Sequence, residues 1–175
     1  MKKILIISLL FLMFTGCEKI EKLTQFSLDY TTSFTVTADL DTQTPINLQD
    51  VVVNIDDKRF DDYDTSKELI EEATIKTIEL KLDANQTTTF DFLTDIDLYI
   101  EADGLPKVRI AWQNNMTDTG AQTVVLKNLS DNLAEYFKKD SIKISAVILT
   151  DQVLTQDVTF DVKLSFYINA AKVGV

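Results

Sequence analysis

The chain has no histidine and a single cysteine, so the commonest catalytic side chains are scarce. Without histidine it lacks the usual general base, the usual partner of a nucleophilic serine and the main zinc ligand. One cysteine excludes an internal disulfide and a thiolate metal site. Four glycines are too few for a phosphate-binding loop, and no Gly-x-Ser-x-Gly, Ser-x-x-Lys or His-Glu-x-x-His motif occurs. These absences argue against an enzyme and predict no cofactor.

The start of the chain has the layout of an export signal. Basic residues 2–3 precede the apolar run 4–14, which is shorter than the roughly 20 residues of a membrane-spanning helix. Small residues then lead to Cys17. Residues 14–17 resemble the lipobox of bacterial lipoproteins at three of four positions and depart from it at Phe14, where a branched aliphatic residue is commoner.

This resemblance implies lipid transfer to the Cys17 sulfur, cleavage before it, and acylation of its new amino group. Each buried CH₂ contributes about 0.8 kcal/mol, and two acyl chains suffice for firm anchoring. The predicted parts are a signal peptide at 1–16, a lipidated tether at 17–25 and one domain at 26–175. The predicted location is the cell envelope, and the outer membrane is favoured over the inner because Glu18 after the cysteine, in place of Asp, resembles outer-membrane lipoproteins of enteric bacteria. The choice between periplasmic and surface faces stays open, and the alternatives are a plain secretory signal or an uncleaved anchor.

The mature chain is strongly acidic. Loss of residues 1–16 removes Lys2 and Lys3 and no acid, so 15 basic residues face 28 acidic ones, a net charge of −13. Such a surface repels nucleic acid and anionic lipid headgroups. The predicted partners are therefore the lipid bilayer, through acylated Cys17, and an envelope protein or a glycan, with no nucleic acid.

Alternation of apolar and polar residues with a period of two predicts antiparallel strands around a shared core. The longest run covers 26–38, with a bend or bulge expected near Thr32. The run 142–149 is apolar at nearly every position after Ser145, which predicts a central strand covered on both faces. The other runs are 46–55, 78–82, 90–101, 107–112, 122–126 and 158–168. Together they predict an all-β fold, an antiparallel two-sheet β-sandwich of about eight strands, with a barrel as the alternative.

Two segments break the alternation and predict short helices that plug the open ends of the sheet pair. Thr65 and Glu68 have capping-box spacing, which predicts a helix at about 65–72. The second helix is predicted at 131–139, where two lysines fall in the last turn and favour the helix dipole.

The densest cluster of charge is a candidate calcium site. Five carboxylates occur within nine residues, at Asp56, Asp57, Asp61, Asp62 and Asp64. Carboxylate oxygens are the ligands that Ca²⁺ prefers, but the segment lacks the glycine and the glutamate of an EF-hand loop. We favour a solvated acidic loop that leads into the first helix.

Two further motifs are candidate sites. Trp112 is followed by Gln113, Asn114 and Asn115, so an exposed Trp112 could stack on a sugar ring. The alternation favours Trp112 as a core residue instead. Ser141, in Asp-Ser-Ile, resembles the short O-glycosylation site of exported Bacteroidota proteins.

These features favour a membrane-anchored binding or structural module whose ligand the sequence does not name. The alternative is a carrier that holds an elongated apolar ligand or lipid between the sheets, lined by Phe90, Phe92, Phe160 and Phe166. A continuous internal void would favour the carrier. A third hypothesis, a glycan hydrolase, needs two facing carboxylates about 5–9 Å apart, and the sequence identifies no such pair.

Overall fold

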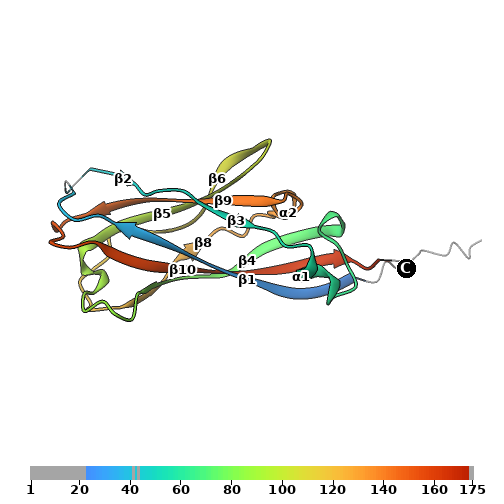
Figure 1. Cartoon of the computed structure of the whole chain (residues 1–175), viewed down its shortest axis with the longest axis horizontal. Helices are drawn as coiled ribbons and strands as arrows, with labels where there is room; N and C mark the ends of the chain where they lie inside the picture. The colour runs from blue at the N-terminus through green and yellow to red at the C-terminus, as the bar shows by residue number, and fades with distance from the viewer. Residues whose placement is uncertain (1–22, 41, 43, 174–175) are drawn as a thin grey trace, which may run out of the picture.

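The computed structural model describes residues 23–40, 42 and 44–173, which form two antiparallel sheets packed face to face (Figure 1). The four-stranded sheet has the order β1 (Leu23–Val36), β10 (Val158–Ala171), β4 (Ile70–Leu82) and β7 (Thr123–Val125). The six-stranded sheet has the order β2 (Ile46–Asn47), β9 (Ser141–Thr150), β5 (Leu93–Ala102), β6 (Leu105–Gln113) and β8 (Lys127–Asn128), and β3 (Val51–Asn54) also pairs with β9. The predicted two-sheet sandwich is confirmed, with more strands than the eight expected, and the barrel alternative is wrong.

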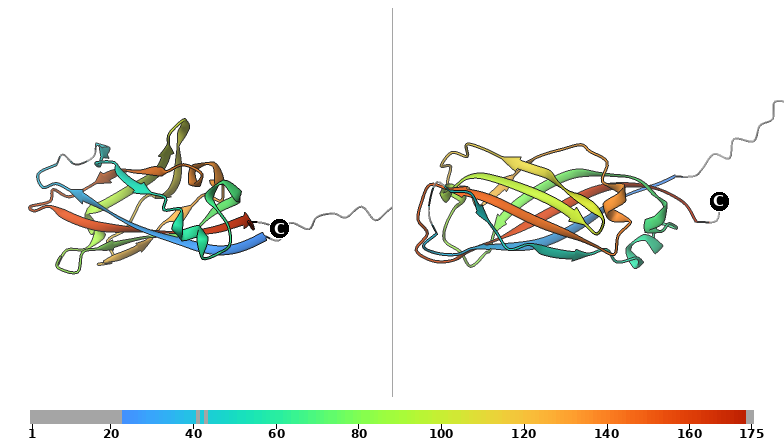
Figure 2. Two further views of the ribbon diagram at one scale, coloured as in Figure 1. Left: turned by 45° about the vertical axis from the view of Figure 1, so that its right-hand side comes forward. Right: turned by 90° about the horizontal axis from the view of Figure 1, so that it is seen from above.

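The core follows directly from the alternation along the strands. β1 and β10 pair residue by residue over the whole of β1, so their apolar residues share one face. A strand of 14 residues is about 46 Å long, which gives the domain its elongated shape (Figure 2). The largest fully buried side chains are Phe60, Phe90, Phe137, Phe160, Phe166, Leu28, Ile70, Ile78, Leu80, Leu93, Ile96 and Leu98.

The two long sides of the sandwich differ. On one side the chain passes from β7 in the first sheet to β8 in the second, with buried Leu126 between them. The Leu126 amide donates to the Ile78 carbonyl at 2.9 Å and ties this crossing to β4. On the other side β1 is the edge strand of its sheet, and the short strands β2 and β3 lie at the edge of the other sheet. The second side is therefore the more open one.

Both described ends of the chain lie at one pole of the sandwich. Leu23 pairs with Ala171, and the two ends leave the same side of the domain (Figure 1). Cys17 and the rest of residues 1–22 lie outside the described residues. Within the described residues, no helix has the length and apolar character needed to span a bilayer.

The helix predicted at 65–72 is wrong. Only a 3-10 turn forms, at Lys67–Leu69, and β4 begins immediately afterwards at Ile70. The Thr65 hydroxyl does not cap this turn, because it donates instead to the Ala171 carbonyl at 2.6 Å. Pairing of β4 with β10 overrides the local helix signal, as tertiary contacts often do.

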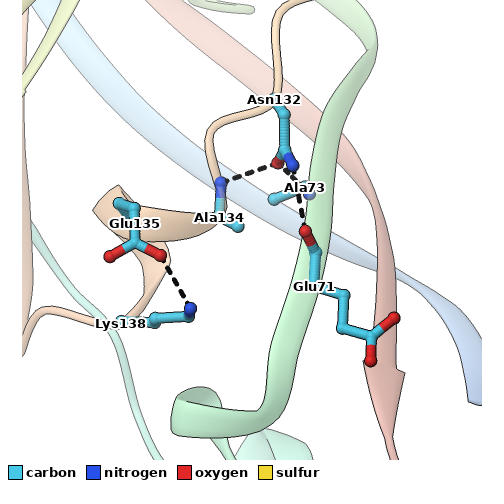
Figure 3. Close-up of polar contacts among 6 residues, drawn as sticks. All are labelled: Glu71, Ala73, Asn132, Ala134, Glu135 and Lys138. Carbon is cyan, nitrogen blue, oxygen red and sulfur yellow. Dashed lines mark hydrogen bonds and ion pairs between the residues drawn. The ribbon is translucent and has the colours of Figure 1, made fainter.

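The helix predicted at 131–139 exists but is shorter, since α2 covers only Ala134–Phe137. Asn132 fixes its start against β4 (Figure 3). The Asn132 side-chain oxygen accepts from the amides of Ala73 and Ala134 at 2.9 and 3.0 Å, and its side-chain nitrogen donates to the Glu71 carbonyl at 2.9 Å. With Phe137 fully buried, α2 packs between the two sheets as expected of a plug.

Two expectations about individual strands are corrected. No bulge occurs at Thr32, because the β1–β10 register is unbroken; the irregularities lie between β10 and β4, at Ser165/Phe166 and Asn169/Ala170. β9 is central in its sheet, as predicted. Its outward residues Val147 and Leu149 are only half-buried, so most of its cover lies on the inner face.

Candidate functional site

A groove of about 610 Å³ opens on the less protected side of the sandwich, between β1 and the β2–β3 segment. This volume is in the range of ligand-binding sites. Its lining residues are Ser33, Phe34, Thr35, Thr37, Leu40, Ile46, Asn47, Leu48, Gln49, Asp50, Val51 and Val52. We refer to this feature as the β1 groove.

The β1 groove exists because the predicted strand 46–55 is interrupted. β2 ends at Asn47 and β3 starts at Val51, and between them the Leu48 amide still donates to the Ala146 carbonyl at 2.9 Å. Leu48 is buried, whereas Gln49 is exposed. Buried Phe34 and Leu48 thus form an apolar floor, whereas Gln49 and Asp50 are exposed at the rim. Val52 adds an exposed apolar side chain to the rim, and such a mixture of apolar and polar groups is suited to binding.

One wall of the groove is an unpaired strand edge. Residues of an antiparallel strand alternate in the direction of their backbone N–H and C=O groups. The Asp29 carbonyl accepts a hydrogen bond from the Arg59 guanidinium at 2.9 Å. Arg59 belongs to α1 (Lys58–Asp61), on the side of β1 that faces away from β10. Opposite Thr35, the Thr159 carbonyl of β10 accepts from Asp83, at 3.2 Å, and so points away from β1. The backbone groups of odd-numbered β1 residues therefore point to the free edge.

Three of these odd-numbered residues, Thr31, Ser33 and Thr35, lie beyond the reach of α1. Their backbone groups have no hydrogen-bond partner on the free edge in the described part of the chain. Two of the three side chains are engaged across the sheet: the Ser33 hydroxyl donates to Asp161 at 2.6 Å, and the hydroxyls of Thr35 and Thr159 lie 2.9 Å apart. At Ser33 and Thr35 the backbone groups are therefore what this wall offers a ligand.

The groove is electrostatically one-sided. Among the described residues that line it, Asp50 alone is charged. The Lys143 ammonium group lies 4.0 Å from Asp50 and 3.5 Å from Glu101, so two carboxylates share this cation. The groove therefore favours a ligand with positive charge, in a domain that is acidic throughout.

The acidic segment 56–64 exposes all five of its carboxylates, in agreement with the solvated loop that the sequence favoured, and it also packs on the domain through aromatic side chains. Phe60 is fully buried and meets the Phe26 ring edge-on at 6.0 Å. Tyr63 stacks on the outer side of Phe26, with ring centroids 3.9 Å apart. The Arg59 guanidinium lies 4.5 Å from the centre of the Tyr30 ring. Burial raises the pKa of Tyr30, and the positive charge of Arg59 opposes that shift.

The five carboxylates of this segment do not gather around a common point. Among the described residues, no group of three or more His, Cys, Asp or Glu side chains is arranged to hold a metal ion. Asp57 pairs with Lys67 at 3.1 Å and Asp64 with Lys172 at 3.6 Å, and Asp56 accepts from the Lys58 amide at 3.0 Å. Asp61 and Asp62 are exposed. The calcium hypothesis therefore gains no support from the geometry.

Lys67 joins the acidic segment to the start of β9. Its ammonium group lies 2.6 Å from Asp140 as well as 3.1 Å from Asp57, and little of its side chain is exposed. Its hydrogen bonds with Asp140 and then Asp57 raise the pKa of Lys67. The hydrogen bond and charge of Lys67 lower the pKa of Asp140. The two carboxylates share this one cation, which favours the charged form of Asp140 and gives it no raised pKa of the kind a general acid needs.

Trp112 is not the core residue that the alternation favoured. The β5–β6 register shifts between Leu98/Ala111 and Tyr99/Arg109, so β6 contains a bulge. Ile110 and Ala111 are consecutively buried, which turns Trp112 to the outer face of the sheet, where it is half-buried. The guanidinium of Arg109 lies 4.9 Å from the Trp112 ring centre, and Arg109 also pairs with Asp97 at 3.1 Å.

Ser141 is the first residue of β9 and pairs with Asn54. Its side chain is half-buried, beside exposed Asp140 and buried Ile142. Glycosylation of Ser141 stays a prediction.

The carrier hypothesis loses its structural basis. A carrier needs a continuous void between the sheets, but the facing apolar side chains form one packed cluster. A small pocket near Ile75, Ile110 and Leu133 measures about 10 Å³, at most room for one water molecule. The four phenylalanines offered as a lining, Phe90, Phe92, Phe160 and Phe166, are all core residues.

Alternation along the sequence does not reveal the β1 groove, because its residues come from two sheets. Two features of the sequence could have indicated the β1 groove. The β1 sequence contains no lysine, proline or glycine over its whole length, which is unusual for an edge strand. The polar pair Gln49-Asp50 interrupts the apolar positions of the 46–55 run.

No protein-family model matches the chain, and no curated protein matches it. Among solved structures, it is similar to one titled as infectious bursal disease virus Gx strain, with 16% identity over 87% of this chain and 33% of that chain and a TM-score of 0.37. It is also similar to CpGH89CBM32-5 from Clostridium perfringens, solved in complex with GalNAc-β-1,3-galactose, with 12% identity over 75% of this chain and 94% of that chain and a TM-score of 0.32.

A third structure concerns the promiscuous specificity of carbohydrate-binding modules from the β-sandwich superfamily. The identity is 10% over 87% of this chain and 57% of that chain, with a TM-score of 0.32. The chain thus spans about a third of the length of the viral chain and about half of this one. At such scores none of these likenesses identifies a family or a function for this protein.

Proposed function

We propose that this protein is a lipid-anchored module of the bacterial cell envelope that binds a partner through the β1 groove. The observation that carries the proposal is the groove itself, with its apolar floor, polar rim and unpaired strand edge. The partner is another envelope component, a protein or a glycan. The proposal assigns the domain no catalytic role and no cofactor.

The position of the groove suits such an anchor. Cys17 precedes Leu23 by six residues, which extend over roughly 20 Å at most. The groove begins at Ser33, about 33 Å along β1 from Leu23. A lipid on Cys17 would hold the pole with the acidic segment toward the membrane, and the groove would lie away from the bilayer surface.

Intact-mass measurement of membrane-extracted protein tests the anchor. We expect the mass of a chain that starts at Cys17 and carries acyl groups, with retention in the outer-membrane fraction. The variant Cys17→Ser should carry no acyl mass. An unmodified wild-type chain that still contains residues 1–16 would contradict the anchor.

Cross-linking in intact cells tests the groove. A photoreactive amino acid at Gln49, on the groove rim, should give a discrete adduct with an envelope component. The same probe at Lys81, an exposed residue of β4, is the matched control and should give none of that adduct. Equal adducts at both positions, or none at Gln49, would contradict binding in the groove.

A second candidate function is glycan binding on the outer face of the six-stranded sheet. The observation that favours it is the bulge that turns Trp112 outward, beside Arg109 and Asp97. Aromatic rings present flat apolar surfaces, and charged neighbours can hydrogen-bond to hydroxyls. Trp112→Ala should abolish glycan retention on an array without loss of folding, and retention that survives this change would dismiss the site.

A further inference from the structure

The edge of β1 differs from the other sheet edges in the described part of the chain. The outer strands β7, β8, β2 and β3 contain 3, 2, 2 and 4 residues, whereas β1 contains 14. Proteins usually protect long edges with lysine, proline, bulges or a covering segment, since bare edges pair with other chains. β1 has no lysine, proline or bulge.

The covering segment of β1 protects only half of it. Arg59 reaches the Asp29 carbonyl, and Tyr63 lies against Phe26. Beyond Asp29, the edge runs into the β1 groove, where Ser33, Phe34, Thr35 and Thr37 form one wall. The uncovered edge and the groove therefore overlap at Ser33 and Thr35.

An extended polypeptide matches this wall better than a lipid or a glycan does. The free backbone groups of Thr31, Ser33 and Thr35 recur every second residue, about 6.8 Å apart, which is the repeat of another β-strand. An added strand would direct alternate side chains toward the apolar floor at Phe34 and Leu48. Backbone hydrogen bonds would supply affinity and the floor would supply specificity.

Charge selects the kind of polypeptide. Asp50 is the one charged side chain among the described residues of the groove, and the mature chain has 15 basic against 28 acidic residues. A segment that carries lysine is attracted, and an acidic one is repelled. A second copy of this chain carries the same excess of negative charge, which opposes pairing of two β1 edges.

We propose that the β1 groove binds an extended, lysine-bearing polypeptide segment of another envelope protein, which adds to β1 as a fifth strand of its sheet. This inference rests on the proposed function and specifies the partner of the same site. The main-chain groups of Thr31, Ser33 and Thr35 receive the segment, and the side chains of the floor take its apolar residues.

Amide hydrogen exchange on the full-length, detergent-solubilised protein tests the inference. The probe is a nine-residue peptide of alternating valine and threonine with lysine at both ends; the matched probe has glutamate in place of lysine. At about ten times its Kd, the lysine peptide should slow exchange at Thr31, Ser33 and Thr35 by about elevenfold. No slowing at these amides, or equal slowing by the glutamate peptide, would overturn the inference.

Two variants at Ser33 distinguish the role of its backbone N–H in peptide binding from the role of its side chain. Ser33→Pro removes the free-edge N–H, a position where proline is tolerated in a strand, and should abolish the slowing at Thr31 and Thr35. Ser33→Ala loses the same bond to Asp161 but keeps the N–H, so it should bind as wild type does. Slowing that persists in a folded Ser33→Pro protein would overturn strand addition. If that variant does not fold, the wild-type exchange data decide alone.

The failures of the two proposals are distinguishable. A Gln49 cross-link in cells that Ser33→Pro does not weaken would leave the groove as a binding site and reject the added strand. Protection of the three amides that rises with protein concentration, without peptide, would identify a second copy as the occupant and overturn the inference.

Discussion

Phe60→Ala is the substitution that most clearly separates a packed acidic segment from a solvated one. Phe60 is fully buried and contacts Phe26 edge to face. Truncation of such a ring costs about 3–5 kcal/mol, because it removes apolar burial and leaves a cavity. For a domain of this size, each kcal/mol lowers the Tm by about 2–4 °C, so the expected decrease is roughly 6–20 °C. Thermal unfolding followed by far-UV circular dichroism measures it.

Tyr63→Ala is the matched control. Its ring also stacks on Phe26 but is 36% exposed, and the outer ring of such a pair contributes only about 1–2 kcal/mol. Its Tm should therefore decrease by less than that of Phe60→Ala. If Phe60→Ala lowers the Tm by no more than about 2 °C, the segment does not depend on this contact and the packed cover is refuted.

Two further predictions concern polar contacts. Asn132→Ala leaves the buried Ala73 amide without its acceptor and should lower the free energy of unfolding, measured in urea, by about 1–3 kcal/mol. Asn132→Asp can still accept this hydrogen bond and should lower the free energy of unfolding by less. Equal decreases in the two variants would contradict this role of Asn132. The pKa of Asp140 is lowered, so its contribution to folding stability is present above about pH 3.9 and is lost in acid. The pKa of Lys67 is raised, so its contribution to folding stability is present below about pH 10.4 and is lost in alkali. The Tm difference between wild type and Lys67→Met should thus be flat from about pH 5 to 9 and shrink on both sides, and a difference unchanged to pH 2 would refute the pairing.

The sandwich was predictable because the alternation that indicates its strands can be read within each segment of the sequence. Alternation along 26–38 and 158–168 assigns each residue to a face, and sheets with one greasy face must pack together. The strand at Ile70 was not predictable from the same rule. The residues just before it carry a helix-start signal at Thr65 and Glu68, and pairing with distant β10 makes the chain extended from Ile70 onward.

The outward orientation of Trp112 could not be predicted from the sequence for a different reason. A bulge adds one residue and exchanges the two faces of everything after it. Two consecutive apolar residues, Ile110 and Ala111, are the only trace of that bulge in the sequence.

The β1 groove depends on which strands become neighbours. Periodicity predicts that 26–38 and 46–55 are strands, but not that β1 becomes a sheet edge or that Gln49 interrupts the facing edge. The order of strands in a sheet is set by long-range pairing, so the groove appears only in three dimensions.

The most direct measurement is the exchange of individual β1 amides in the ligand-free protein. We expect fast exchange at Thr31, Ser33 and Thr35, whose N–H groups point to the free edge, and slow exchange at Phe34 and Val36, which bond to β10. Uniformly slow exchange along residues 31–36 at low protein concentration would mean that the edge is already paired, and the groove would have no strand edge to offer a partner.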